Sequence, residues 1–195
     1  MIIRLTRLIC VPLPPVRGGY PFGFEAPSKV VSVGDDVTLM RGVGSFAVRH
    51  GNNAAARVLA RLMRLPAAGA RVPVRLVVTR TRGVERWHRT FAGRDFVTYQ
   101  RRTADGLMAE SAGPFEILFR LDEKGGVRLY RQEGFAFRLG RLRILLPRWL
   151  SPRVVARERV SADGSRVRAS VRVSAPLAGL LIAYGGRVEL EKEGL

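Results

Sequence analysis

The sequence predicts a mainly β domain, a strongly curved antiparallel sheet or barrel of about nine strands that wraps one short amphipathic helix. Three observations support this fold class. Segments in which apolar and polar residues alternate follow one another from Val72 toward the C-terminus. Gly, Asp-Gly and Gly-Gly turn signals separate these segments, as in a series of hairpins. Only residues 53–65 show clear helical periodicity instead.

The predicted helix spans residues 53–65. Asn52 or Asn53 can cap its first turn, and Pro66 ends it by disfavouring helical geometry at the preceding residue. Its apolar positions follow the spacing i, i+3, i+4, i+7, i+8 and are Ala55, Val58, Leu59, Leu62 and Met63. Three arginines, Arg57, Arg61 and Arg64, occupy the other face. This pattern favours a solvated face on a core-packed helix over a surface that meets anionic lipid or an acidic partner.

Strands are predicted on both sides of the helix. Before it, Gly42 and Gly44 separate two short strands. The predicted segments are 37–41, 46–49, 72–79, 84–91, 95–102, 107–110, 115–121, 127–139, 142–146, 154–160, 166–174 and 188–190. Gly134 is expected to form a bulge in the long segment, and residues 177–184 are equally compatible with a helix or a buried strand.

The alternation predicts which side chains form the core. We expect one face to be buried, comprising Phe115, Ile117, Phe119, Val167, Ala169, Val171 and Val173. We expect the other face of the 166–174 segment, with Arg166, Arg168 and Arg172, to meet solvent.

The N-terminal residues 1–34 are rich in proline and glycine and are predicted to be an arm or linker, with an edge strand at residues 30–33. Residues 35–195 then form a single β-rich domain. Cys10 is the only cysteine, so the printed sequence excludes an internal disulfide and a multi-cysteine metal site. We expect a cytoplasmic location, with the membrane periphery as the alternative.

The net charge of +18 is carried almost entirely by arginine, since only 3 of the 34 basic residues are lysine. Phosphate-binding surfaces ordinarily use both residue types. The skew therefore favours codon bias over a selected phosphate site. We expect nonspecific attraction to anionic surfaces at low salt and no specific nucleic-acid partner.

Several motifs are distributed as in a known family. They are Leu62-Met63-Arg64-Leu65-Pro66, Val72-Pro73-Val74, Glu85-Arg86-Trp87-His88-Arg89-Thr90-Phe91, Gly113-Pro114, Leu146-Pro147, Leu150-Ser151-Pro152 and Pro176-Leu177-Ala178-Gly179-Leu180-Leu181. Over roughly residues 37–191 the chain resembles the bacterial domain of unknown function 4166 family. That resemblance implies an accessory role beside a dehydrogenase-like enzyme, and it supplies no catalytic residues. The proline-rich N-terminus departs from the helical lead-in that the family leads us to expect.

The 84–91 strand is the most unusual face in the chain. It places Glu85, Trp87, Arg89 and Phe91 on one side, so the two aromatic rings would bury a carboxylate and a guanidinium with them. Structural ion pairing is favoured over a ligand pocket. Glu158 on an apolar strand face raises the same question, and Tyr99 is the fifth candidate ligand-binding residue.

Common catalytic and metal motifs are missing from the sequence. His50 and His88 lie on separate segments, and there is no nucleophile elbow or Walker motif. We therefore expect no metal, no cofactor and no catalytic residue. The favoured function is a non-catalytic binding module for a small hydrophobic or lipid-like molecule. The alternatives are an enzyme or enzyme subunit with a Glu/Arg/Tyr-lined pocket, and an electrostatic binder of membrane surfaces or nucleic acid.

Overall fold

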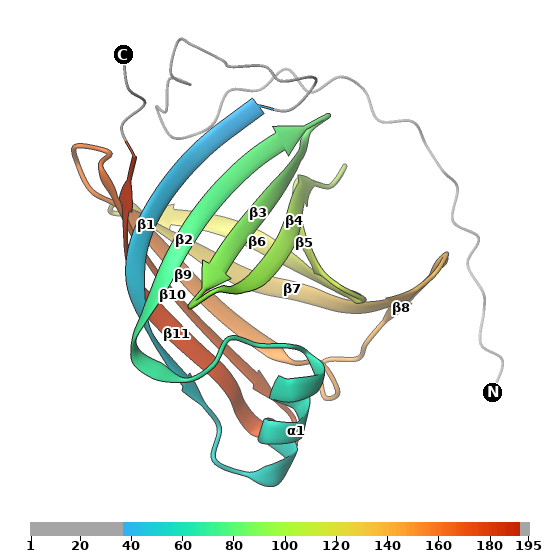
Figure 1. Ribbon diagram of the computed structural model, residues 1–195. Helices are drawn as coiled ribbons and strands as arrows, with labels where there is room; N and C mark the ends of the chain where they lie inside the picture. The colour runs from blue at the N-terminus through green and yellow to red at the C-terminus, as the bar shows by residue number, and fades with distance from the viewer. Residues whose placement is uncertain (1–36, 192–195) are drawn as a thin grey trace, which may run out of the picture.

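A computed structural model describes residues 37–191, which form eleven strands and one helix (Figure 1). The elements are β1 (Val37–His50), α1 (Ala54–Leu62), β2 (Gly69–Thr81), β3 (Val84–Phe91), β4 (Arg94–Arg102), β5 (Met108–Ala112), β6 (Phe115–Lys124), β7 (Val127–Leu139), β8 (Leu142–Leu145), β9 (Arg153–Val160), β10 (Arg166–Ala175) and β11 (Gly179–Leu190). The predicted arm at residues 1–34, including the edge strand at 30–33, lies outside the described residues.

The strands close into an antiparallel barrel. Their order is β6-β5-β4-β3-β2-β1-β11-β10-β9-β7-β8, and the additional pairing of β6 with β7 joins the two sides of the sheet. Ten strands therefore form the ring, and β8 lies outside it, paired only with β7. Closure leaves no unpaired strand edge in the ring, and it turns one face of the large sheet inward, where the apolar side chains are buried. The predicted mainly β class is confirmed.

The prediction of two short strands before the helix was wrong, because β1 runs without a break through Gly42 and Gly44. These glycines allow close approach of β11 instead of making a turn. A Cβ on Gly44 would lie 1.9 Å from the carbonyl oxygen of Arg187, and one on Gly42 would lie 2.5 Å from that of Glu189. A glycine in a strand can mark such an approach as readily as a turn.

The helix α1 lies at one end of the barrel, where it contacts β11 and β1 (Figure 1). Asn53 caps it as predicted: its side-chain oxygen accepts a hydrogen bond of 2.7 Å from the amide of Ala56. The predicted face is borne out in part: Leu59 and Met63 pack against the helix-end cluster. Ala56 and Ala60 are the buried residues, however, and Val58 is exposed. Small side chains face the barrel because the helix end packs closely on Ala178 and Leu181.

The barrel interior contains two apolar clusters. One gathers around Phe46, Phe91 and Trp87, and the other contains Met108, Phe119, Tyr130 and Val154. Phe119 is fully buried, as predicted, and the inward-facing residues of β10 are half-buried. Their alternates, Arg166, Arg168 and Arg172, are exposed, also as predicted.

Two irregular segments are resolved by the pairing. The register of β6 against β7 shifts between Leu118 and Phe119, opposite Gly134, which is the predicted bulge. Residues 177–184 and 188–190 are not separate elements, because β11 continues from Gly179 to Leu190. This segment forms a strand and not a helix because β11 is hydrogen-bonded to β10 on one side and to β1 on the other.

Candidate functional site

Polar side chains line one part of the barrel interior, on the same strand faces as the apolar core. Cross-strand pairing links Arg80 to Glu85, Glu85 to Gln100, and Gln100 to Glu110, which places four polar residues side by side on β2 to β5. Cross-strand partners share a face, and Trp87 and Phe91 lie on this face of β3. Since both rings are buried, the row faces the interior.

Glu85 is held in place by two neighbours. Arg80 donates a hydrogen bond of 2.7 Å to one carboxylate oxygen, and the indole nitrogen of Trp87 donates one of 3.0 Å to the other. This pairing is the structural role that sequence reasoning favoured for the buried carboxylate. Glu85 therefore fixes the orientation of Trp87.

Arg89 is held in a different way, without a carboxylate. Its guanidinium donates a hydrogen bond of 3.0 Å to the hydroxyl of Thr98, and its central carbon lies 5.0 Å from the ring centroid of Trp87. Within residues 37–191, Arg89 has no carboxylate within ion-pair distance. Because a guanidinium has five N–H donors, some of them stay available to a partner in the interior.

Glu158 on β9 forms the second polar centre. The hydroxyl of Tyr130 donates a hydrogen bond of 2.5 Å to its carboxylate, and Arg128 lies 3.9 Å from the same oxygen. Burial raises the pKa of Glu158 despite the hydrogen bond from Tyr130 and the charges of Arg128 and Arg89, which lower it. Burial, together with the neighbouring Glu158, also raises the pKa of Tyr130 well above its usual value. The pair thus retains protons that solvent-exposed groups would release at lower pH.

Aromatic rings form an apolar wall beside these groups. Tyr184 of β11 stacks on Phe46 with ring centroids 6.0 Å apart and meets the edge of Phe91 at 5.6 Å. Because β11 and β3 are not paired, the contact between Tyr184 and Phe91 crosses the interior. Burial raises the pKa of Tyr184 to about 12, so it is neutral at physiological pH.

Glu158 has Arg128 of β7 as its cross-strand partner on one side and small residues on the other. Its cross-strand partner on β10 is Ala169, whose own partner on β11 is Gly186. Two residues earlier on β9 is Ala156, on the same face. The side chain of Glu158 points inward and still keeps 21% of its surface exposed. Solvent therefore reaches part of the inward-pointing Glu158 side chain.

The structure brings together four of the five residues predicted as ligand-binding, and Tyr99 is not among them. Tyr99 pairs with Arg86, on the face opposite to Glu85 and Arg89, and 48% of its surface is exposed. Tyr99 lies apart from the other four residues because the register of β4 turns Thr98 and Gln100 inward. Tyr130 takes the place that Tyr99 was expected to fill.

Sequence reasoning missed Tyr130, Tyr184 and Glu110. The alternation of β7 indicates that Tyr130 shares a face with residues two positions away, but not which strand lies across from it. Glu110 was missed because the short β5 strand carries too little alternation to reveal a face. Their grouping depends on contacts between distant strands.

A second buried carboxylate, Glu116, lies outside this cluster. It is completely buried and accepts hydrogen bonds from Arg143 at 2.6 Å and Arg101 at 3.1 Å, with Arg138 at 3.5 Å. Its strand neighbours Phe115 and Ile117 face the other way, Ile117 toward the interior cluster. The three arginines, each partly exposed, cover Glu116 from the solvent side, which makes this cluster a structural clamp between β4, β6, β7 and β8.

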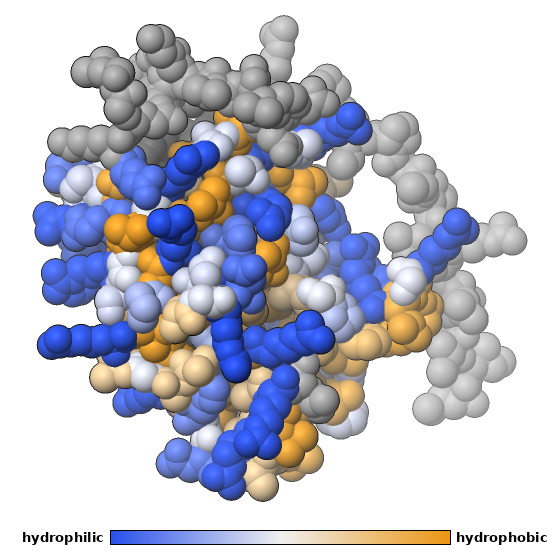
Figure 2. All heavy atoms as spheres, in the orientation of Figure 1, coloured by the Kyte–Doolittle hydropathy of each residue, from blue (hydrophilic) through white to orange (hydrophobic). Residues whose placement is uncertain are grey.

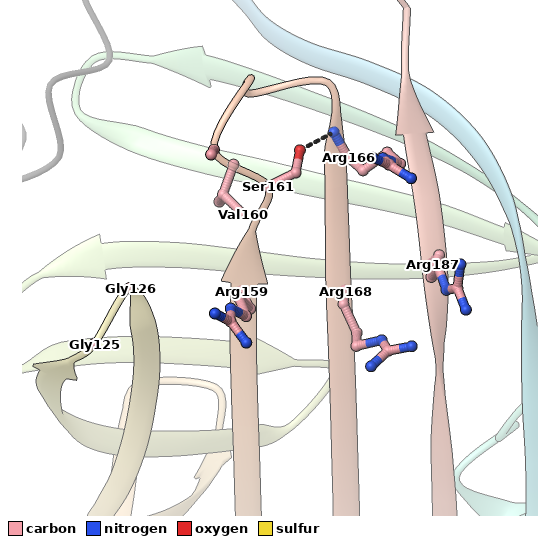
Figure 3. Close-up of a pocket in the computed structure, with 9 residues that line it drawn as sticks. Gly125, Gly126, Arg159, Val160, Ser161, Arg166, Arg168 and Arg187 are labelled. Carbon is pink, nitrogen blue, oxygen red and sulfur yellow. Dashed lines mark hydrogen bonds between the residues drawn. The ribbon is translucent and has the colours of Figure 1, made fainter.

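A row of arginines lies on the outer wall. Arg159, Arg168 and Arg187 are direct cross-strand partners on β9, β10 and β11, and Figure 3 shows them side by side with Arg166 above. They line a shallow depression of about 580 Å³. In the described part of the chain none of the three has a carboxylate within ion-pair distance, so like charges directly oppose one another.

Residues 37–191 contain neither a cluster of metal ligands nor a membrane-spanning helix. No three His, Cys, Asp or Glu side chains lie close enough together to hold a metal ion. No helix in the same residues has the length and apolar character needed to span a bilayer.

The fold and interior define the class of protein: a small closed antiparallel β-barrel with a polar cluster set against an apolar wall. Residues 32–188 match the model of the domain of unknown function DUF4166, so the chain belongs to that family, as the sequence motifs indicated. No curated protein and no solved structure matches the chain.

Proposed function

We propose that the barrel is a non-catalytic binding module that holds a small hydrophobic or lipid-like molecule in its interior. The observation that carries this proposal is the partial exposure of Glu158, an inward-facing carboxylate with the small residues Ala156, Ala169 and Gly186 on one side of it. A ligand site needs apolar walls and a few polar groups that fix orientation, and the interior has both.

Arg89 and the Tyr130–Glu158 pair would orient the polar head of the ligand. Arg89 is anchored by Thr98 and Trp87 and keeps donors for an oxygen acceptor. Glu158 supplies an acceptor for a hydroxyl or amine. Phe46, together with the other aromatic rings of the wall, would contact the apolar part.

The test uses cis-parinaric acid, a fluorescent fatty acid, with energy transfer from Trp87 as the readout, in a Trp149→Phe background that leaves Trp87 as the only tryptophan. Wild-type protein should bind the probe and transfer energy to it. Ala169→Met places a larger side chain beside Glu158 and should abolish binding, whereas Arg168→Ser on the outer face is the matched control and should not. Ala169→Met binding as well as wild type, with unchanged melting temperature, would refute an interior site.

The second candidate is an enzyme or enzyme subunit that uses the same cluster. It is favoured by one observation, the hydrogen-bonded Tyr130–Glu158 pair with raised pKa values in an apolar interior. Such a pair can donate and accept protons. Probe binding that survives Glu158→Gln, together with loss of turnover of a bound carbonyl or ester compound, would favour the enzyme.

The third candidate is an electrostatic binder of anionic surfaces or nucleic acid, favoured by the outer arginine row. Binding of this kind weakens steeply with added salt and shows no sequence preference. The accessory role beside a dehydrogenase-like enzyme, which family resemblance implies, remains a proposal. Co-purification of such an enzyme with the tagged chain would test it.

A further inference from the structure

The β7–β8 hairpin projects from the barrel wall. β8 pairs with β7 alone, through Ala136 to Leu139, and Gly140 with a φ of 56° makes the tight turn at the tip. The exposed apolar residues of this hairpin and the following turn are Leu139, Leu142, Ile144, Leu145, Trp149 and Leu150. Figure 2 shows hydrophobic atoms at this projecting end, with a hydrophilic side chain beyond them.

Exposed apolar side chains lie on both faces of the hairpin. Ile144 and Leu145 are consecutive in β8 and therefore point to opposite faces, yet 43% and 59% of their surfaces are exposed. A partner protein that packs on one face would leave the other face in water. A medium that surrounds the tip from all sides covers both at once.

The charges and the aromatic residue around this apolar tip match a lipid headgroup layer. Arg141 at the tip and Arg148 in the turn are exposed, and neither has an ion-pair partner within the described residues. Trp149 is 75% exposed, and indole rings favour the boundary between headgroups and hydrocarbon. Long arginine side chains can reach phosphate groups while their stems lie against apolar surface.

Ion pairs next to the tip tie the hairpin to the barrel wall and restrict its orientation. Arg138 of β7 and Arg143 of β8 are cross-strand partners and both bind Glu116. In the turn that follows, the hydroxyl of Ser151 donates to the carbonyl of Pro147 at 2.9 Å and fixes the loop that carries Trp149. A preorganised apolar tip loses little conformational entropy on insertion.

We propose that the β7–β8 hairpin and the Trp149 turn form a membrane-docking device that inserts to headgroup depth in a bilayer containing anionic lipid. The apolar residues supply insertion, and Arg141 and Arg148 supply the preference for anionic headgroups. This inference does not rest on the interior site, because β8 and the tip of the hairpin lie outside the ring of ten strands.

Flotation of the full chain with vesicles tests the proposal, at physiological salt. Vesicles of phosphatidylcholine mixed with phosphatidylglycerol should bind the wild-type protein, and phosphatidylcholine alone should bind it more weakly. Leu139→Ser combined with Leu142→Ser should lower partitioning at least about tenfold to both compositions. Arg141→Ser combined with Arg148→Ser should remove only the preference for the anionic vesicles.

Two further arms separate insertion from other attachments. Brominated lipid should quench Trp149 and spare Trp87, which is buried in the barrel. Leu177→Ser, at another fully exposed leucine, is the matched control and should bind like wild type.

Three outcomes would overturn the proposal. The first is wild-type partitioning by the double-leucine variant, and the second is loss of vesicle binding on substituting Arg168 and Arg187 instead. The third is that the wild-type protein does not bind vesicles but forms a dimer, and that the leucine substitutions dissociate this dimer. That result would show that the hairpin is a self-association surface. Unchanged melting temperatures of the variants show that these results do not come from misfolding.

Discussion

Substitution of Glu116 by glutamine tests whether the outer carboxylate clamps the strands that meet there. The side chain is completely buried and contacts Arg143, Arg101 and Arg138, which come from three different strands. Removing one partner of a buried ion pair typically costs about 3–5 kcal/mol. The arginines are each partly exposed and can turn toward water, so we expect a smaller loss, about 2–3 kcal/mol of unfolding free energy.

The stabilisation by Glu116 should depend on pH in a definite direction. Burial raises the pKa of Glu116, but the hydrogen bond from Arg143 and the charges of Arg143, Arg138 and Arg101 outweigh it, and the net pKa is lowered. A lowered folded-state pKa means that the stabilisation is present above the unfolded-state pKa. It is lost as the pH falls through the folded-state pKa. The difference in unfolding free energy between wild type and Glu116→Gln should therefore be largest at neutral pH and disappear in acid.

Urea denaturation at neutral and acidic pH measures both effects. For a domain of this size, a loss of about 2–3 kcal/mol corresponds to a melting-temperature decrease of about 5–10 °C. Arg120→Gln is the control, since its bridge to Glu133 is exposed on the arginine side and ordinary surface pairs contribute little. A loss below about 0.5 kcal/mol at neutral pH, or a gap that persists unchanged in acid, would show that Glu116 does not clamp the strands.

Three other predictions follow from the packing. Phe119→Ala should cost about 3–5 kcal/mol in urea denaturation, whereas Arg168→Ala should stay within about 0.5 kcal/mol; equal losses would contradict the observed register. Gly44→Ala should destabilise by about 1–3 kcal/mol or more, because its Cβ meets backbone, while Gly134→Ala, which meets only a leucine side chain at 3.3 Å, should cost less. Burial raises the pKa of Glu158, so the contribution of Glu158 to stability is greatest below its unfolded-state pKa and declines as the pH rises through its folded-state pKa. Glu158→Gln should therefore flatten the fall in unfolding free energy with pH. An unchanged pH profile of stability would contradict a raised pKa for Glu158.

The sequence by itself determined the fold class, most strand positions and the helix cap. Alternation along β3 and β10 identified the faces of both strands, because side chains in a strand point to opposite sides with period two. The Asn53 cap and the Gly134 bulge were also predictable from local chemistry, since each depends on neighbours within a few residues.

Only the tertiary structure decided how the barrel closes and which polar groups meet inside it. The pairing of β6 with β7 and the position of β8 outside the ring depend on contacts between strands, which alternation does not encode. For the same reason Tyr130, and not Tyr99, reaches the interior cluster: Tyr130 meets Glu158 across 28 residues of sequence. A face is a local property of a strand, whereas the residue opposite that face is set by closure of the whole barrel.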